Sequence, residues 1–532
     1  MRKVLSIVFS LTLVFGNAQE KVWVFFKDKP NVDNQILQPE KYLSSQSLER
    51  RASQNIDLHP TDFPVESSYL NEIRNLNIPV VRSSKWLNAL SVYVSSQIEI
   101  DLLEALPFVE KVSPVKVLKM TEVESFYKTN KSAAASLNYG DSKTQIQQLN
   151  GDFLHDQGYR GQGMMIAVID GGFSDVDLIG GFDSLWMNGR IVTSYDFVDN
   201  DTNVFHLGSH GRSVLSVMGG YIDGVYVGTA PNANYVLLKS EDESSEKKIE
   251  EDNWVAAAEF ADSVGADVIN SSLGYNTFDG GIGDYVYSDF DGRTTVVSQG
   301  AVWAHRKGIL VVNSMGNEGS SSWQYMLSPA DADSILSIGG ADGANNHVGF
   351  ASVGPTFDGR LKPNVSALAT GVYVLSGSNT TQPGNGTSFA APLISGLAAC
   401  LWQADPTLTN YQVLELIERS SHQHTNPDTL LGCGIPNFAL AFNNISIDER
   451  SALLNLKIYP VPFGDELTVE GFGENQSEIE VSLTNLNGTS IETKSHFEND
   501  KLVIDNLNSL SSGVYILNIL LDGKSHNFRV LK

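Results

Sequence analysis

Three polar residues, far apart in this 532-residue chain, have the side-chain types that nucleophilic catalysis needs. Asp170 ends an apolar run and precedes two glycines. His210 opens a short predicted helix, and Ser388 ends a glycine-rich segment that leads into a second predicted helix. Alone, each residue fits a turn, an exposed position or a helix cap. Together, the histidine can take the serine proton while the carboxylate fixes the histidine tautomer, and the order Asp, His, Ser is one known order of such a triad. We therefore predict that the three residues form a catalytic triad.

The segments around these residues alternate between short apolar runs and helical stretches. Buried strands are predicted at 164–169, 235–238, 267–270, 309–312 and 335–338, and helices at 253–264, 301–307 and 389–403. This alternation indicates an α/β domain with a mostly parallel sheet. Sites in such domains form beyond the carboxyl ends of the strands, where Asp170 lies.

Two further regions flank this α/β domain. Residues 20–118 contain predicted strands at 22–26 and 90–94 with helical stretches between and after them, which indicates a small α+β unit. Beyond residue 450, short alternating strands and the turn signals Asn487-Gly488 and Asp522-Gly523 favour a small all-β sandwich. The predicted division is a signal peptide, a small α+β domain, a linker with a processing site, the α/β domain and the β-sandwich, at 1–18, 19–120, 121–149, 150–445 and 450–532.

The N-terminus and the charge indicate an exported protein. Arg2 and Lys3 precede an apolar run at 4–15, and a small-residue pattern predicts cleavage before Gln19. No later stretch is long and apolar enough to span a membrane, so no span is expected in the mature protein. The net charge of −26 lies almost entirely beyond residue 130 and argues against binding to nucleic acid or anionic lipid.

The motifs around the three residues resemble those of the subtilase family of serine proteases. The most specific of them is Gly-Thr-Ser-Phe-Ala-Ala-Pro at 386–392, and the resemblance covers roughly 150–445. It implies a subtilisin-like, mostly parallel sheet flanked by helices. It also implies a secreted serine endopeptidase that hydrolyses peptide bonds through an acyl-enzyme. An inactive scaffold that binds polypeptides or glycans, and a transpeptidase or maturation factor, remain alternatives.

The same resemblance implies roles for further residues and shows three departures. Asn317 would donate its side-chain N–H to the oxyanion beside the Ser388 backbone N–H, and Ser272, Leu273 and Gly274 would form a substrate-binding edge strand. The departures are a glycine where Ser or Thr usually follows the catalytic Asp, an arginine where Thr usually follows His-Gly, and an asparagine where many relatives have Asp, at Gly171, Arg212 and Asn364. Arg212 could clash with the histidine, lower its pKa or contact substrate acids.

The flanking regions resemble partners of this enzyme type. Residues 20–118 resemble the inhibitor pro-domain of subtilases, which implies an intramolecular inhibitor that assists folding and is removed by self-cleavage between about 120 and 145. Residues 450–532 resemble the C-terminal sorting domain of the type IX secretion pathway, through the motifs at 458–463, 513–515 and 528–532. This implies passage through the periplasm and across the outer membrane by the secretion machinery, then removal of the domain and release or surface attachment.

Cofactor and cysteine expectations are few. Catalysis of this type requires no cofactor, and the resemblance allows structural calcium without assigning ligands. The loop that begins at Asp199 starts like a calcium loop but has Val204 and His210 where an EF-hand has glycine and glutamate. Cys400 and Cys433 are the two cysteines, and whether they pair stays open.

Overall fold

The computed structural model describes most of the chain outside the N-terminus and the predicted linker. The described residues are 20–114, 137–281, 283–452, 457–459, 463–470, 479–485, 490–491, 493–498, 501–508, 510–511, 513–521 and 524–532. The predicted signal peptide, most of the predicted linker, and the turn signals at 487–488 and 522–523 lie outside these ranges. The chain divides into two compact units, Met1–Phe442 and Asn443–Lys532.

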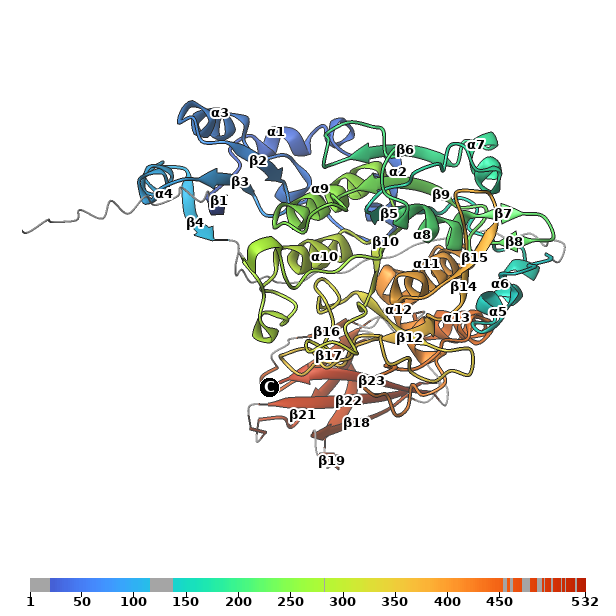
Figure 1. Cartoon of the computed structure of the whole chain (residues 1–532). Coiled ribbons are helices and arrows are strands. Elements are labelled where there is room, and N and C mark those ends of the chain that lie inside the picture. The colour runs from blue at the N-terminus through green and yellow to red at the C-terminus, as the bar shows by residue number, and fades with distance from the viewer. Residues whose placement is uncertain are drawn as a thin grey trace, which may run out of the picture. The chain divides into compact units, whose positions relative to one another are not determined.

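The N-terminal part of the first unit is an antiparallel sheet accompanied by short helices (Figure 1). Its strand order is β2-β3-β1-β4, with β1 at Glu20–Phe26, β2 at Val80–Ser84, β3 at Ala89–Val94 and β4 at Val109–Pro114. Its helices are α1 (Val32–Ile36), α2 (Ser45–Ser53), α3 (Ser67–Asn75) and α4 (Gln97–Glu104). The predicted strands at 22–26 and 90–94 fall in β1 and β3.

Alternation along β1 gives this sheet two apolar faces. Val22, Val24 and Phe26 pack in one core with residues of α3 and α4. Trp23 and Phe25 point the other way and join the core that surrounds α9 (Ile249–Val264) and α10 (Val296–Arg306). The N-terminal sheet therefore lies on these two helices.

The central part of the first unit is a seven-stranded parallel sheet with the order β13-β12-β11-β10-β5-β9-β6. Five strands match the predictions, namely β5 (Met165–Asp170), β9 (Asn234–Lys239), β10 (Val268–Ser271), β11 (Leu310–Ser314) and β12 (Leu336–Ala341). Two were not predicted, β6 (Ile191–Asp196) and β13 (Val365–Leu368). The predicted α/β class with a mostly parallel sheet is confirmed.

Helices pack in two pairs around this sheet. Helix α9 contacts α10, and their core includes Met165, Ala167 and Ile169 of β5. Helix α8 (His210–Gly219) contacts α11 (Thr387–Ala404), which also packs on β10 to β13. Other elements of this part are α5 (Lys143–Gln147), α6 (Gly151–Asp156), α7 (Asp183–Met187), α12 (Asn410–Arg419), and the hairpins β7–β8 (Tyr221–Ile222, Tyr226–Val227) and β14–β15 (Val372–Leu375, Thr381–Gly384). Helix α13 (Phe438–Ala452) includes the boundary between the two units.

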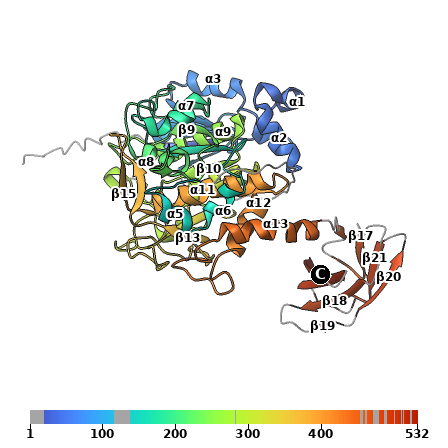
Figure 2. The ribbon, with the colours of Figure 1, turned by 90° about the vertical axis from the view of Figure 1, so that its right-hand side faces the viewer.

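The second unit contains two four-stranded antiparallel sheets (Figure 2). One has the order β16-β17-β21-β20 and the other β19-β18-β22-β23. Leu467 and Ile504 from the first sheet share a buried core with Leu483 and Leu517 from the second, which makes a β-sandwich of the kind predicted. The strands are β16 (Lys457–Tyr459), β17 (Leu467–Glu470), β18 (Ile479–Asn485), β19 (Ser490–Ile491), β20 (Lys494–Glu498), β21 (Lys501–Asp505), β22 (Val514–Leu521) and β23 (Lys524–Leu531).

Candidate active site

Asp170 and His210 meet at the carboxyl end of the parallel sheet. Asp170 is the last residue of β5 and is fully buried, while His210 is the first residue of α8 and is partly exposed. The His210 Nδ1 atom lies 2.7 Å from Asp170 Oδ1. Because this contact engages Nδ1, the other ring nitrogen, Nε2, is left to act as a base.

Electrostatics favour the protonated form of this histidine. The negative charge of Asp170 raises the pKa of His210 above its ordinary 6.5, with a smaller contribution from Glu243, while burial acts in the opposite direction. The imidazolium that forms when His210 takes a proton is therefore stabilised by its surroundings.

Ser388 lies in the first turn of α11 and is half-buried, and the residue that follows it contacts the histidine ring. The rings of Phe389 and His210 have their centroids 6.0 Å apart. The Ser388 Oγ atom lies 3.5 Å from the Ser272 carbonyl oxygen, and no hydrogen bond joins it to His210 among the described residues. The structure thus brings the three predicted residues to one site, with the serine hydroxyl turned toward β10. Hydrogen bonds between catalytic side chains are often long or poorly aligned without substrate, and tighten when substrate binds.

Two N–H donors border a small space beside Ser388. Gly386 has φ 143°, which disfavours other residues, and a Cβ built on it would lie 3.7 Å from Asn317 Nδ2 and 3.7 Å from the Ser388 backbone nitrogen. The absence of a side chain at Gly386 therefore leaves room for a small oxygen atom between these donors. An oxyanion bound in this space would lie between two N–H donors, which is the arrangement that stabilises such a charge.

Thr387 orients the Asn317 amide. Its backbone N–H and its Oγ1 donate to Asn317 Oδ1 at 3.0 and 3.2 Å, and its Oγ1 also lies 3.1 Å from the Gly316 carbonyl oxygen. With the amide oxygen occupied, the Asn317 NH₂ group is the end that remains for a ligand. No role for Thr387 was predicted, because a buried threonine in a helix start carries no sequence signal of this contact.

The predicted substrate-binding segment follows β10 directly. Ser272 Oγ donates to the Ser388 carbonyl oxygen at 2.8 Å, and Asn313 Nδ2 donates to the Leu273 carbonyl oxygen at 3.2 Å. Neither the N–H nor the C=O of Gly274 has a hydrogen-bond partner among the described residues. These peptide groups are available to an added strand.

Arg212 points away from the histidine ring. Its guanidinium donates to Asp175 Oδ2 at 2.9 Å and to the Ser174 carbonyl oxygen at 3.0 Å, and the residue is buried. It therefore serves to fix the 174–175 turn against α8. The third departure, Asn364, is likewise structural. Its side-chain oxygen accepts a hydrogen bond from Ser337 N–H, and its Nδ2 donates to Glu418 Oε1.

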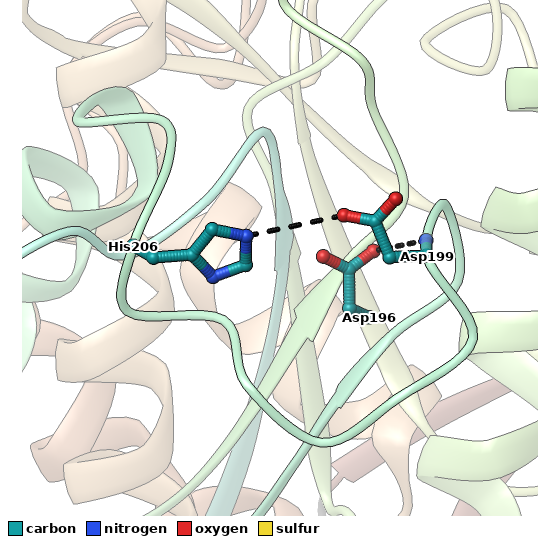
Figure 3. A group of neighbouring side chains, drawn as sticks. All are labelled: Asp196, Asp199 and His206. Atoms are coloured by element: carbon teal, nitrogen blue, oxygen red, sulfur yellow. Dashed lines mark hydrogen bonds and ion pairs between the residues drawn. The ribbon is translucent and has the colours of Figure 1, made fainter.

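Asp196, the last residue of β6, gathers with Asp199 and His206 of the following loop, as Figure 3 shows. The buried Asp196 carboxylate accepts the ammonium of Lys239 at 2.8 Å and the backbone N–H groups of Val198 and Asp199. A protein cation thus already balances its charge, and calcium prefers oxygen ligands to histidine nitrogen. This group does not fit a calcium ion.

The two cysteines are free in the structure, so they form no disulfide. Burial raises the pKa of the Cys400 thiol strongly and that of Cys433 to about 12. Both are therefore poor nucleophiles. No helix in the described ranges combines the length and apolar character needed to cross a bilayer.

Known families match three parts of the chain. The subtilase family matches residues 161–434, a Peptidase S8 propeptide domain of Bacteroidota matches 21–133, and a secretion system C-terminal sorting domain matches 457–531. The last match points to secretion or the cell surface. The expected pro-domain and sorting domain are both confirmed.

Individual proteins give the same result. Subtilisin NAT of Bacillus subtilis subsp. natto is 32% identical over 301 residues, which cover 54% of this chain and 67% of that protein. Subtilisin of Bacillus pumilus is 32% identical over 301 residues, covering 54% of this chain and 92% of that protein. The crystal structure of fervidolysin from Fervidobacterium pennivorans shares the fold, with a TM-score of 0.55, 17% identity, and coverage of 94% of this chain and 71% of that one.

Proposed function

The chain belongs to the subtilase family and is a serine-type endopeptidase, and from that premise we propose that Asp170, His210 and Ser388 are its catalytic triad. The observation that carries the proposal is the 2.7 Å contact between His210 Nδ1 and Asp170 Oδ1 at the start of α8, close to the start of α11. That contact leaves Nε2 as the ring nitrogen that would take the serine proton.

In the proposed reaction, His210 takes the Ser388 proton as the oxygen attacks the peptide carbonyl. The resulting oxyanion accepts N–H donors from Asn317 and the Ser388 backbone, which stabilise it more than the ground-state carbonyl. His210 then gives the proton to the leaving amine. A water molecule hydrolyses the acyl-enzyme, with His210 again as the base. Family members need no cofactor for catalysis, and commonly bind structural calcium.

The flanking domains complete the proposal. Two observations support the role of an intramolecular inhibitor for the N-terminal domain. It packs on α9 and α10 through a continuous apolar core, and it matches a propeptide domain. We propose that the enzyme removes this domain itself, at a site between about 120 and 145. The C-terminal sandwich would direct the chain through the periplasm and across the outer membrane before it is removed.

Replacing the nucleophile tests the proposal. Ser388→Ala should abolish casein hydrolysis and leave the N-terminal domain attached, whereas the matched control Ser378→Ala, at an exposed serine after β14, should do neither. A Ser388→Ala protein that processes itself and cleaves casein at the wild-type rate would remove Ser388 from the triad. A wild-type protein that binds peptides without cleaving them would favour the scaffold alternative.

A further inference from the structure

Glu243 lies directly beside the residue that follows the catalytic aspartate. A Cβ built on Gly171 would lie 2.9 Å from Glu243 Oε1 and 3.1 Å from its Cγ. The Glu243 side chain thus fills the space that a side chain at position 171 would take. This bears on the first departure from the family pattern, because Ser or Thr at 171 would force the Glu243 side chain to shift from this position.

The Glu243 carboxylate is exposed and has no described cation beside it. Within the site it acts on His210, whose pKa it helps to raise. The two lysines closest in sequence are engaged elsewhere. Lys247 Nζ lies 2.8 Å from Ser245 Oγ, and Lys248 Nζ lies 3.0 Å from Glu251 Oε2.

Three other glutamates of the segment around Glu243 lie close together. The carboxylates of Glu241, Glu246 and Glu250 lie within 4.8 Å of one another. Burial first, and mutual repulsion second, raises the pKa of Glu241 to about 8 and that of Glu246 to about 7. The Glu241 carboxyl is therefore mostly protonated near neutral pH and adds little charge, which leaves Glu243 as an exposed carboxylate of this segment that a cation could meet.

The sheet order places this segment along the substrate path. Strands β10, β5 and β9 are consecutive, so Ser272–Gly274, Gly171 and Glu243 all leave the same edge of the sheet. A peptide that pairs with Ser272–Gly274 and presents its carbonyl to Ser388 would lie close to Gly171 and Glu243. Its side chains would meet the carboxylate at this point.

We propose that Glu243 is a specificity-determining residue that binds the cationic side chain of a lysine or arginine in the substrate. The inference rests on the proposed function of the site. Glu243 would pair with a residue near the scissile bond, and Gly171 is the position that makes room for it. Substrates with a carboxylate at the same position would be repelled by Glu243.

Matched peptides test this proposal on the mature enzyme. Internally quenched peptides would carry Lys, Gln or Glu in turn at each of the four positions on either side of the scissile bond. At one or two positions, kcat/KM should favour Lys over Gln by about fivefold, the size of a partly exposed ion pair. The preference should shrink in 1 M NaCl, because salt screens such pairs.

Variants assign the preference to its residue. Glu243→Gln should bring the Lys-to-Gln ratio of kcat/KM close to one, and Glu243→Lys should make the Glu peptide the better substrate. Asp223→Asn, the same change of charge in the β7–β8 hairpin, should keep the wild-type ratio. A ratio near one for the wild type at every position, or an unchanged ratio in both Glu243 variants, would overturn the proposal while leaving the peptidase intact. Failure of the wild type to cleave any peptide would instead contradict the proposed function.

Discussion

Asp262 on α9 holds the N-terminal domain through three of its cations. Its Oδ1 lies 2.5 Å from Arg50 and 2.8 Å from Arg51, and its Oδ2 lies 3.1 Å from Lys85 Nζ. The Asp262, Arg50 and Arg51 side chains are at most 2% exposed. Although burial opposes it, Arg51, Lys85 and Arg50 together hold the pKa of Asp262 well below its usual range.

Asp262→Asn would leave these cations buried without their main counter-ion. Removing one partner of a buried ion pair costs about 3–5 kcal/mol. At about 1.4 kcal/mol per factor of ten, the N-terminal domain should bind at least 100-fold more weakly. Arg51 keeps a second carboxylate, Asp62 at 2.7 Å, so the lower end of this range is expected.

The assay dilutes the complex that the peptidase forms with its own cleaved N-terminal domain, and follows the peptidase activity that is released as the complex dissociates. The concentration at which half of the peptidase activity is released should rise about 100-fold in Asp262→Asn. The activity of the fully released enzyme should change little, because Asp262 lies on α9, away from the site. The control Asp223→Asn should release its activity at the wild-type concentration. The double variant Asp262→Asn with Arg51→Met should lose less binding free energy than the sum of the two single variants. A release concentration within twofold of the wild type would refute the reasoning, and an equal loss in the released enzyme would show damage to the fold instead.

Three other predictions concern the site and the tail. Asn317→Ala should lower kcat about 100- to 1,000-fold, the range known for the corresponding donor of subtilisin itself, and an unchanged kcat would remove Asn317 from the oxyanion hole. Because His210 must be neutral to act as a base and its pKa is raised, kcat/KM should rise with pH through a midpoint above 6.5, and Glu243→Gln should move that midpoint down. Deleting 450–532 should retain the protein in the periplasm with catalysis intact, and normal surface delivery of the truncated chain would contradict the sorting role.

The sequence predicted the five inner strands of the parallel sheet and missed the two at its edges. Strand β6 has the polar sequence Ile-Val-Thr-Ser-Tyr-Asp and is largely half-exposed at one edge, so it has no apolar run. Strand β13 has four residues at the other edge. Helix α10 begins at Val296, before the predicted 301, because Thr295 caps it through Ser298 N at 3.2 Å. The two β-branched residues after the cap hide this start.

Within the site, residues in local motifs could be proposed from the sequence, and residues placed by distant contacts could not. Asp170, His210, Ser388 and Asn317 each lie in a short pattern beside a strand or helix end. The role of Glu243 depends on a contact with Gly171, 72 positions earlier in the chain. Sequence spacing carries no information about such a contact. The sequence therefore showed that Gly171 departs from the family pattern, but not that Glu243 lies beside it.

The most direct test of the central claim is covalent labelling of the purified protein with a fluorophosphonate, followed by mass spectrometry of its peptides. An activated serine reacts with this probe, whereas an ordinary hydroxyl does not. The account predicts one adduct, on Ser388, that disappears in Ser388→Ala and is strongly reduced in His210→Ala. An adduct on another residue, or labelling that persists in Ser388→Ala, would contradict it.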